Sequence, residues 1–391
     1  MPRRAPRFAV YAHPWALGDV GVERALNELA AAGVDGIQLS LSYHAASVLT
    51  PRSPRRRVFH DDRGSAYFDY QAAAPGPWRL RPRVLADAAE VVPRVIEGAA
   101  ARDIQVVAWL VYLYGHDLAS RHPDLAVRDA WGSVHPAQLC PSQPAVREHA
   151  LRLTSAALSL DPTGAAFGGL HAESLSFLPW SYGLPGPKAA VRLDASAARM
   201  LGLCFCDACR GRAREAGLDP DAAARTVRSL FDASVAGASP ARGRDEAAAY
   251  SDLLAGATLE LNREAAALVA ARDLRFSSTA GESEPERGDR GAAAAVNALV
   301  DEVRVRMVPG ATAAQVTAWR DAALTGCRPG THAFAQYRLP DFQDGAALTA
   351  AVSAARSAGI ESHRFYEFSL LAEEHLGWLR ACREQLDVAT A

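Results

Sequence analysis

The sequence predicts an α/β protein with a single (β/α)8 TIM barrel that takes up residues 1–391. Short runs of β-branched and aromatic residues alternate with longer alanine-rich amphipathic stretches, and about eight such units fit into the chain. The first expected strand runs into His13-Pro14-Trp15, without the glycine fingerprint of a doubly wound nucleotide-binding sheet. Expected loops on one face are long and those on the other are tight, as in barrel enzymes.

The expected elements alternate as strand and helix along the chain. Apolar residues at positions 22, 26 and 29 recur three or four residues apart, which is the pattern of one helix face. Strands are predicted at Phe8–Ala12, Gly36–Ser42, Ile104–Tyr112, Ala166–Glu173, Leu274–Thr279, Val300–Met307, His332–Leu339 and Ile360–Phe368. Helices are predicted at Val20–Ala32, Pro82–Arg102, Pro144–Leu160, two stretches within Asp221–Arg272, Gly291–Leu299, Ala313–Thr325, Gln343–Ala358 and Leu371–Leu386.

Three connections that follow expected strands are long enough to be insertions, at about 43–81, 113–143 and 174–220. In a (β/α)8 barrel, the loops at the carboxyl ends of the strands build the active site. The loop lengths therefore predict a broad cleft on that face of the barrel.

Charge and composition exclude several classes of protein. The chain has 42 basic and 44 acidic residues, so a nucleic-acid groove built on bulk positive charge is not expected. Its single lysine, Lys188, stands in a Pro/Gly-rich stretch rather than in a phosphate-loop or Schiff-base motif, and we expect no organic cofactor. Because no apolar run has the length of a membrane span or a signal peptide, we expect a cytoplasmic protein without membrane contact.

The clearest motif is a cysteine triplet, Cys204-Phe205-Cys206-Asp207-Ala208-Cys209. Three thiolates this close can enclose one tetrahedral metal ion if a fourth ligand joins them, and a site with four cysteines is closed and structural. Cys140 is the best fourth ligand, because its loop and that of the triplet follow neighbouring strands of the barrel. The alternative is a set of buried cysteines that bind nothing.

Three features stand together between about Leu110 and Arg214: the stretch Leu139-Cys140-Pro141-Ser142-Gln143-Pro144-Ala145-Val146-Arg147-Glu148, a strand that ends in Glu173, and the cysteine triplet. On these features the region resembles family 42 glycoside hydrolases, which are β-galactosidase-like TIM barrels, and related hypothetical glycosyl hydrolase barrels. It implies a structural Zn²⁺ held by Cys140, Cys204, Cys206 and Cys209, with Glu173 as the general acid/base. The chain departs from the family at Ala172, where an asparagine is usual, and at Gln336, the nearest match to the seventh-strand nucleophile glutamate.

Glycoside hydrolysis uses two carboxyl groups, so Glu173 needs a partner. Glu367, in Phe365-Tyr366-Glu367-Phe368 at the end of the eighth strand, is the preferred second catalytic carboxylate. Glu282 follows the fifth strand but lies in a polar run, which is more typical of a solvated surface.

Histidine and aromatic residues recur at or just beyond the ends of the expected strands, where a sugar site would need stacking platforms and hydrogen-bonding groups. Trp109 is in the middle of a strand and is assigned to the barrel core. The candidate substrate-binding residues are His13, Trp15, Tyr43, His44, Tyr112, His116, His171, Trp180, Gln336, Arg338 and Tyr366.

The sequence therefore predicts an enzyme that hydrolyses an O-glycosidic bond of a small glycoside or oligosaccharide. A metal-dependent sugar isomerase or epimerase is a second hypothesis, since His44, His171, Glu173 and Glu367 supply part of a divalent-metal site. A non-catalytic carbohydrate-binding barrel is a third, favoured by the missing glutamate at the seventh strand. The sequence leaves open whether a second copy of the chain closes the cleft in a homo-oligomer.

Overall fold

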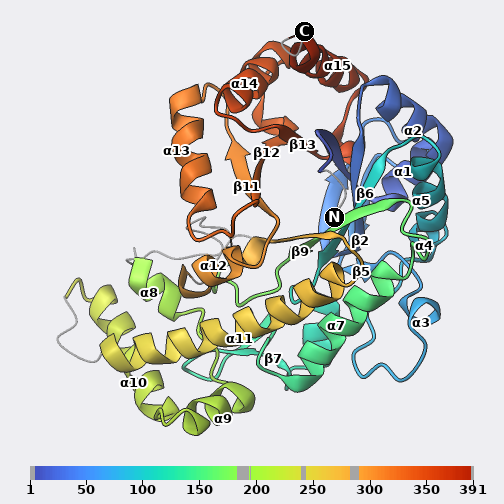
Figure 1. Ribbon diagram of the computed structural model, residues 1–391. Coiled ribbons are helices and arrows are strands. Elements are labelled where there is room, and N and C mark those ends of the chain that lie inside the picture. The colour runs from blue at the N-terminus through green and yellow to red at the C-terminus, as the bar shows by residue number, and fades with distance from the viewer. Residues whose placement is uncertain (1–4, 183–192, 194, 239–243, 282–289, 389–391) are drawn as a thin grey trace.

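The computed structural model describes residues 5–182, 193, 195–238, 244–281 and 290–388, so Lys188 and Glu282 lie outside the described part. Eight parallel strands form the centre of the molecule (Figure 1). Each of the eight predicted strands corresponds to one of them. The barrel strands are β1 (Phe8–Ala12), β2 (Gly36–Tyr43), β6 (Gln105–Val111), β9 (Phe167–Glu173), β10 (Arg275–Ser278), β11 (Glu302–Met307), β12 (His332–Arg338) and β13 (Ser362–Tyr366).

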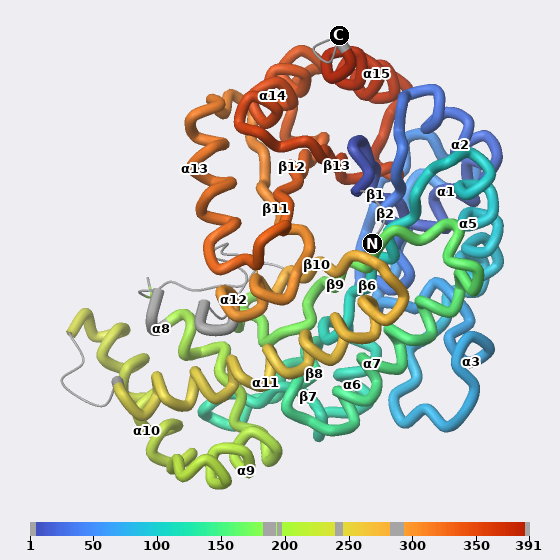
Figure 2. Tube along the Cα trace, in the orientation of Figure 1, coloured from blue at the N-terminus to red at the C-terminus, as the bar shows by residue number. Residues whose placement is uncertain are grey.

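Parallel ladders join these strands in the order β10-β9-β6-β2-β1-β13-β12-β11. The chain returns on itself so that β13 pairs with β1 (Figure 2). The remaining seam, between β10 and β11, has no ladder among the described residues, but Asp301 N donates to Phe276 O at 2.8 Å across it. The structure thus confirms an α/β fold with a nearly closed eight-stranded parallel barrel, which fits the predicted TIM barrel.

Helices surround the barrel (Figure 1). The predicted helix at Pro82–Arg102 is two separate helices, because Pro93 lacks the N–H needed to continue a preceding turn and instead stands in the first turn of the second helix. Gly21, with φ of 98°, likewise separates two short helices near the N-terminus. The surrounding helices are α1 (Pro14–Val20), α2 (Val22–Ala31), α4 (Ala86–Ala89), α5 (Val92–Ala100), α7 (Pro144–Leu158), α11 (Arg244–Ala270), α12 (Arg290–Asn297), α13 (Ala313–Leu324), α14 (Gly345–Ser357) and α15 (Glu373–Val388).

The three long connections carry short elements of their own. The connection after β2 contains the antiparallel pair β3 (Ala46–Leu49) and β4 (Val58–Asp61), then β5 (Ser65–Ala66) and α3 (Tyr70–Ala73). The connection after β6 contains α6 (His116–Arg121) and the antiparallel pair β7 (Ala126–Arg128) and β8 (Val134–Leu139). The connection after β9 contains α8 (Ala195–Met200), α9 (Asp207–Glu215) and α10 (Pro220–Val235).

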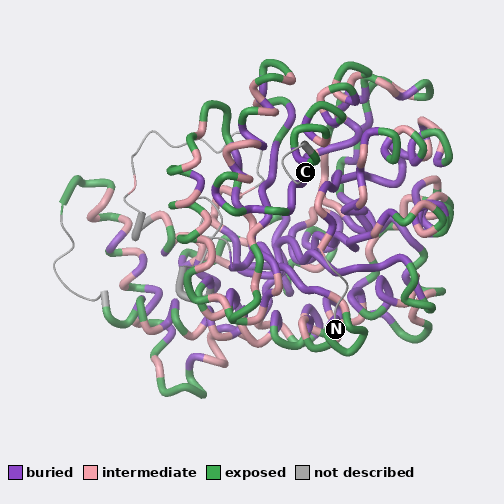
Figure 3. Tube along the Cα trace, turned by 45° about the horizontal axis from the view of Figure 1, so that its top comes forward, coloured by how far each residue is buried: buried purple, intermediate pink, exposed green. Residues whose placement is uncertain are grey.

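The apolar interior has two parts. The larger one lies between the barrel strands and the surrounding helices, and buried residues follow the strands while exposed residues lie on the outer helices (Figure 3). A second apolar cluster lies under the connections after β6 and β9 and includes Val127, Phe205, Leu230 and Tyr250. No helix in the described ranges is long and apolar enough to cross a membrane.

Candidate functional site

A polar cavity of about 170 Å³ opens at the carboxyl ends of the barrel strands. It is the place where barrel enzymes keep their active sites. Seven residues predicted from the sequence line it together: Tyr43, His44, His171, Glu173, Gln336, Arg338 and Tyr366.

Glu173 is the last residue of β9, and its side chain is held at the edge of the cavity. Trp109 Nε1 donates to Glu173 Oε2 at 2.8 Å, and the Tyr182 hydroxyl donates to Oε1 at 3.4 Å. The side chain is 9% exposed, so the carboxylate is largely shielded yet still lines the cavity. One carboxylate oxygen is thus fixed by an indole, while the other takes a longer and weaker hydrogen bond at the cavity surface.

The local sequence of β9 explains this position. Gly169 has its Cα so close to β10 that a Cβ would lie 2.8 Å from the Arg275 carbonyl oxygen. Only a glycine lets the two strands approach this closely. Side chains alternate along a strand, so Glu173 shares the cavity-facing side with His171, whose Nδ1 lies 2.9 Å from Ser277 Oγ.

Two tyrosines line the cavity from the ends of β2 and β13. The hydroxyl oxygens of Tyr43 and Tyr366 are 2.9 Å apart. Burial, and secondarily the nearby ionisable groups, raises the pKa of both phenols well above the usual value. Both hydroxyls therefore stay protonated, so one of them donates to the other, and the accepting hydroxyl keeps its own proton for a ligand.

Glu367, the predicted second carboxylate, does not line the cavity. Its Oε2 lies 3.2 Å from His13 Nε2, and Ser369 Oγ donates to its Oε1. Burial raises the pKa of Glu367 to about 8 and lowers the pKa of His13 to about 3. At neutral pH the contact therefore joins two neutral groups and is not an ion pair, and Glu367 Oε2 has no hydrogen-bond partner among the described residues.

The His13 ring packs against Tyr43, with 4.6 Å between the two ring centroids. Trp15 stacks on the other side, 5.3 Å from His13. Glu367, predicted to be catalytic, thus forms a buried cluster with His13 and Trp15, which were predicted to contact substrate, and none of the three lines the cavity.

Three further predicted residues lie elsewhere. The Tyr112 hydroxyl is 2.8 Å from Thr154 Oγ1, on the helix side of the barrel wall. His116 packs against Tyr114 with ring centroids 5.9 Å apart. Trp180 lines a separate hollow beside β8. Each follows a strand end in sequence, but a strand end specifies an edge of the barrel and not the direction of a side chain.

The cavity also contains residues that sequence reasoning assigned elsewhere or passed over. Trp109 lines the cavity as well as being buried, because its indole lies on the inner face of β6. Tyr11, Arg304 and Arg306 line it from β1 and β11. The alternation of arginine with valine in Glu302–Met307 was the available signal, since residues two apart in a strand share one face.

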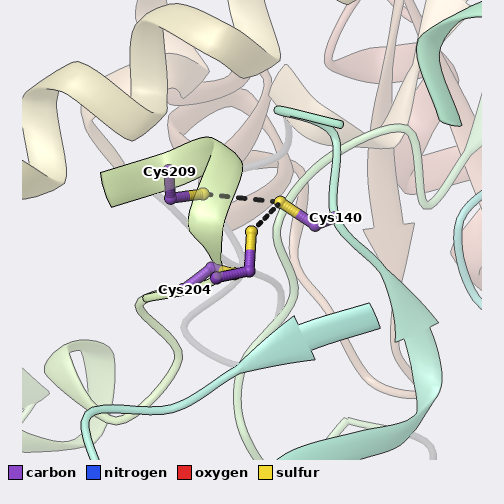
Figure 4. Close-up of side chains that lie close together, drawn as sticks. Cys140, Cys204 and Cys209 are labelled. Carbon is purple, nitrogen blue, oxygen red and sulfur yellow. Dashed lines mark hydrogen bonds between the residues drawn. The ribbon is translucent and has the colours of Figure 1, made fainter. Parts of the chain in front are cut away.

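The four predicted cysteines come together outside the barrel (Figure 4). Their sulfur atoms all lie within 4.8 Å of one another, and Cys140 Sγ is 3.4 Å from Cys209 Sγ and 3.6 Å from Cys206 Sγ. These separations are too long for a disulfide and near the roughly 3.8 Å expected between sulfurs that surround one tetrahedral ion at about 2.3 Å.

Local structure and nearby donors support this arrangement. Cys206 is the N-cap of α9 and Cys209 lies in its first turn, so the helix start places both sulfurs on one side. The Arg128 backbone N–H donates to Cys204 Sγ at 3.4 Å, and Gln143 Nε2 donates to Cys206 Sγ at 3.6 Å. All four side chains are buried. This donor set fits a metal ion.

Comparison with known proteins relates the chain to others through its fold. No family model matches the sequence, and no curated protein matches it. Solved structures do match. The fold is one that glycosidases use. A β-galactosidase from the psychrophilic Marinomonas ef1 superposes with a TM-score of 0.60 at 10% identity, over 98% of this chain and 60% of that one.

An α-L-fucosidase (isoenzyme 2) from Paenibacillus thiaminolyticus gives a TM-score of 0.58 at 12% identity, over 99% of this chain and 50% of that one. The β-amylase catalytic domain from Paenibacillus polymyxa gives 0.57 at 12% identity and covers 98% of both chains. This chain therefore spans only half to about 60% of the fucosidase and the β-galactosidase but nearly all of the β-amylase domain. At these identities the likeness concerns the barrel alone.

Proposed function

We propose that the protein hydrolyses an O-glycosidic bond of a carbohydrate, with Glu173 as the general acid/base. The observation that carries the proposal is the Glu173 carboxyl group at the mouth of the barrel, fixed by Trp109 and facing a polar cavity lined by aromatic residues. In the reaction, the carboxyl proton passes to the leaving oxygen as its bond to the sugar carbon breaks, and water supplies the new hydroxyl group. The named activities of the superposed fucosidase, β-galactosidase and β-amylase support the same class of substrate.

The second catalytic group is less directly supported. Among the residues that the structure describes, Glu173 is the one carboxylate that lines the cavity. Glu367 as its partner stays a prediction, and it requires the buried acid to lose its proton and turn away from His13. As oriented, Glu367 contacts His13, which packs against Tyr43 of the cavity lining, so its replacement is expected to affect substrate positioning more than bond cleavage.

The proposal is tested by Glu173→Gln, which keeps the size and the hydrogen bond from Trp109 but removes the transferable proton. Hydrolysis should be followed on a panel of methyl glycosides and the matching 4-nitrophenyl glycosides. Methyl glycosides have a poor leaving group, so we expect a loss of about 10²- to 10⁴-fold for them, and a clearly smaller loss for the nitrophenyl compounds, which need little protonation.

Glu361→Gln is the matched control, since its side chain is 66% exposed and the residue directly precedes β13, at the opposite end of the barrel from Glu173. It should hydrolyse both substrate sets like the wild type. An equal loss for both leaving groups in Glu173→Gln, or no loss, would contradict the role of Glu173 as a proton donor.

A non-catalytic carbohydrate-binding barrel is the second candidate function. Gln336 favours it, because it lines the cavity where a seventh-strand carboxylate would act, and an amide binds hydroxyls but forms no glycosyl intermediate. If no glycoside is cleaved while sugars still raise the melting temperature, this function replaces the hydrolase. The isomerase hypothesis has less support, because His44, His171 and Glu173 do not form a metal-ligand set among the described residues.

We further propose that Cys140, Cys204, Cys206 and Cys209 hold a structural Zn²⁺. Four thiolates complete a tetrahedral shell and leave no position for water, so this ion would stabilise the loops and take no part in the reaction. The backbone amide of Arg128 and the Gln143 side chain would then be the outer hydrogen-bond donors to sulfur.

A further inference from the structure

One wall of the cavity is unusually basic. Arg304 and Arg306 of β11 and Arg338 of β12 all line it, together with Gln336. Arg306 pairs with Gln336 in the parallel register of the two strands, and residues two apart share a face, so the four side chains form one contiguous surface. Arg304 Nη1 donates to Gln336 Oε1 at 3.0 Å, which keeps the amide within the basic surface. We call these four residues the basic wall.

Two arginines of the basic wall present positive charge at the mouth of the cavity. Arg306 and Arg338 are exposed there, while Glu173, the one described carboxylate that lines the cavity, belongs to a different wall. Asp341 lies 3.7 Å from Arg306, and both side chains are partly exposed. Exposed guanidinium groups that line an aqueous cavity attract an anion.

The same barrel shows what arginines with a purely structural role look like. Toward the other end of the barrel, Arg364 is fully buried and its Nη2 lies 2.6 Å from Glu302 Oε1. Arg275 approaches the same carboxylate at 3.6 Å. Those arginines are enclosed and share an internal acid, whereas Arg306 and Arg338 are exposed at the mouth. Packing therefore explains the inner pair but not the exposed Arg306 and Arg338.

We propose that the basic wall binds an oxyanion substituent of the sugar, so that the substrate is an acidic glycoside carrying a carboxylate, sulfate or phosphate group. This inference rests on the proposed function of the cavity and specifies its substrate class. Guanidinium groups bind carboxylate and phosphate oxygens through paired, charge-assisted hydrogen bonds, which gives orientation as well as affinity. The anion would be held by β11 and β12, while the glycosidic oxygen lies at Glu173.

Equilibrium binding tests the inference without requiring turnover. Wild-type protein is titrated calorimetrically with D-glucuronate, D-galacturonate, D-glucose 6-sulfate and D-glucose 6-phosphate, and with the neutral parents D-glucose and D-galactose. At least one acidic sugar should bind about 10- to 100-fold more tightly than its neutral parent. The preference should shrink as NaCl rises from about 0.05 to about 0.5 M. Comparison among the acidic sugars identifies which oxyanion is recognised.

Three variants locate the effect. Arg306→Gln and Arg338→Gln should each weaken binding of the acidic sugar much more than binding of the neutral parent, and so remove most of the preference. Asp341→Asn should bind the acidic sugar more tightly, by about 2-fold, because it removes a competing negative charge. Arg263→Gln, an exposed position on α11 away from the cavity, is the matched control and should behave like the wild type.

Equal binding of acidic and neutral sugars would overturn the inference while leaving the proposed hydrolase intact. Equally tight calorimetric binding of inorganic sulfate or phosphate and of the acidic sugars would also overturn it, since the wall would then recognise a free anion and not a sugar. If the proposed hydrolase function is wrong instead, an acidic sugar should still bind with the expected preference, but its glycosides should not be cleaved.

Discussion

The cavity and the cysteine cluster are built differently, because barrel strands supply most of the cavity lining whereas the connections after β6 and β9 supply the cluster. The cavity is open and polar, and its groups stand on seven barrel strands. The cysteine cluster is closed, with four sulfurs that face each other inside their own apolar core. The contrast indicates two separate roles. The strands fix the reacting groups, and the cluster fixes the loops around them.

The two regions should therefore fail in different ways. A change in the cysteine cluster should cost stability first, and a change in the cavity should cost chemistry first. Tyr182 is the point where the regions meet, because it contacts Glu173 and lies on the connection that leads to Cys204.

The largest effect on stability is expected from Cys204→Ser. Removal of one thiolate opens the site, and the binding free energy of a structural zinc ion is part of the folding free energy, so we expect a loss on the order of 5 kcal/mol. Native mass spectrometry should find one zinc per wild-type chain and none in the variant. A strong chelator should lower the melting temperature of the wild type but not that of Cys204→Ser.

Cys327→Ser is the matched control for this experiment, because Cys327 is a partly exposed thiol outside the cluster. It should keep both its zinc and its melting temperature. If Cys204→Ser is as stable as Cys327→Ser, or if the wild type contains no zinc, the cysteines only fill their core and do not fix the loops through a metal ion.

A medium effect is expected on the pH dependence of stability, through Glu367 and His13 behind Tyr43. Folded Glu367 keeps its proton up to a pKa of about 8, whereas a glutamate in the unfolded chain releases it near pH 4.5. Between these values the unfolded state binds fewer protons, so this group makes the protein less stable as pH rises. Folded His13, with its pKa lowered to about 3, has the opposite effect between about pH 3 and 6.5.

The two slopes offset each other between about pH 4.5 and 6.5, and above that range only Glu367 counts. Denaturant unfolding should therefore show that the wild type loses about 2 kcal/mol relative to Glu367→Gln between pH 6.5 and 8. The difference between the two proteins cancels all other titrations. A constant difference across this range would mean that Glu367 is already ionised, which would restore it as a candidate nucleophile.

How well the sequence predicts each region depends on how far apart in the sequence its contacting residues lie. The cysteine cluster was predictable in full, because three ligands lie within six residues and topology brings the fourth loop alongside. The eight strands were equally visible in the pattern of apolar residues. Their order around the barrel then placed Glu173 and Glu367 at the same edge.

Side-chain direction was not predictable from the same signals. Glu173 ends β9 and Glu367 directly follows β13, but Glu173 faces the cavity while Glu367 contacts His13 and Ser369. This difference depends on which neighbours accept the carboxyl group, a long-range property that strand position does not encode. Trp109 was missed for a related reason, since a side chain can be buried and still line a small cavity.

The smallest effect is expected from Tyr182→Phe, and it tests whether the two regions are coupled. The hydroxyl is 3.4 Å from Glu173 Oε1, a long hydrogen bond, and the side chain is half-exposed. We expect a loss of about 3- to 10-fold in kcat and no change in melting temperature, because such a bond contributes about 1 kcal/mol.

The coupling is measured by a double-mutant cycle with zinc removal, at a temperature where the zinc-free protein is still folded. If the cluster acts on the cavity by holding Tyr182 in place, zinc removal should lower kcat in the wild type but hardly further in Tyr182→Phe. Additive losses would show instead that the loop reaches the cavity by another contact, and an unchanged kcat in both proteins would make the two regions independent.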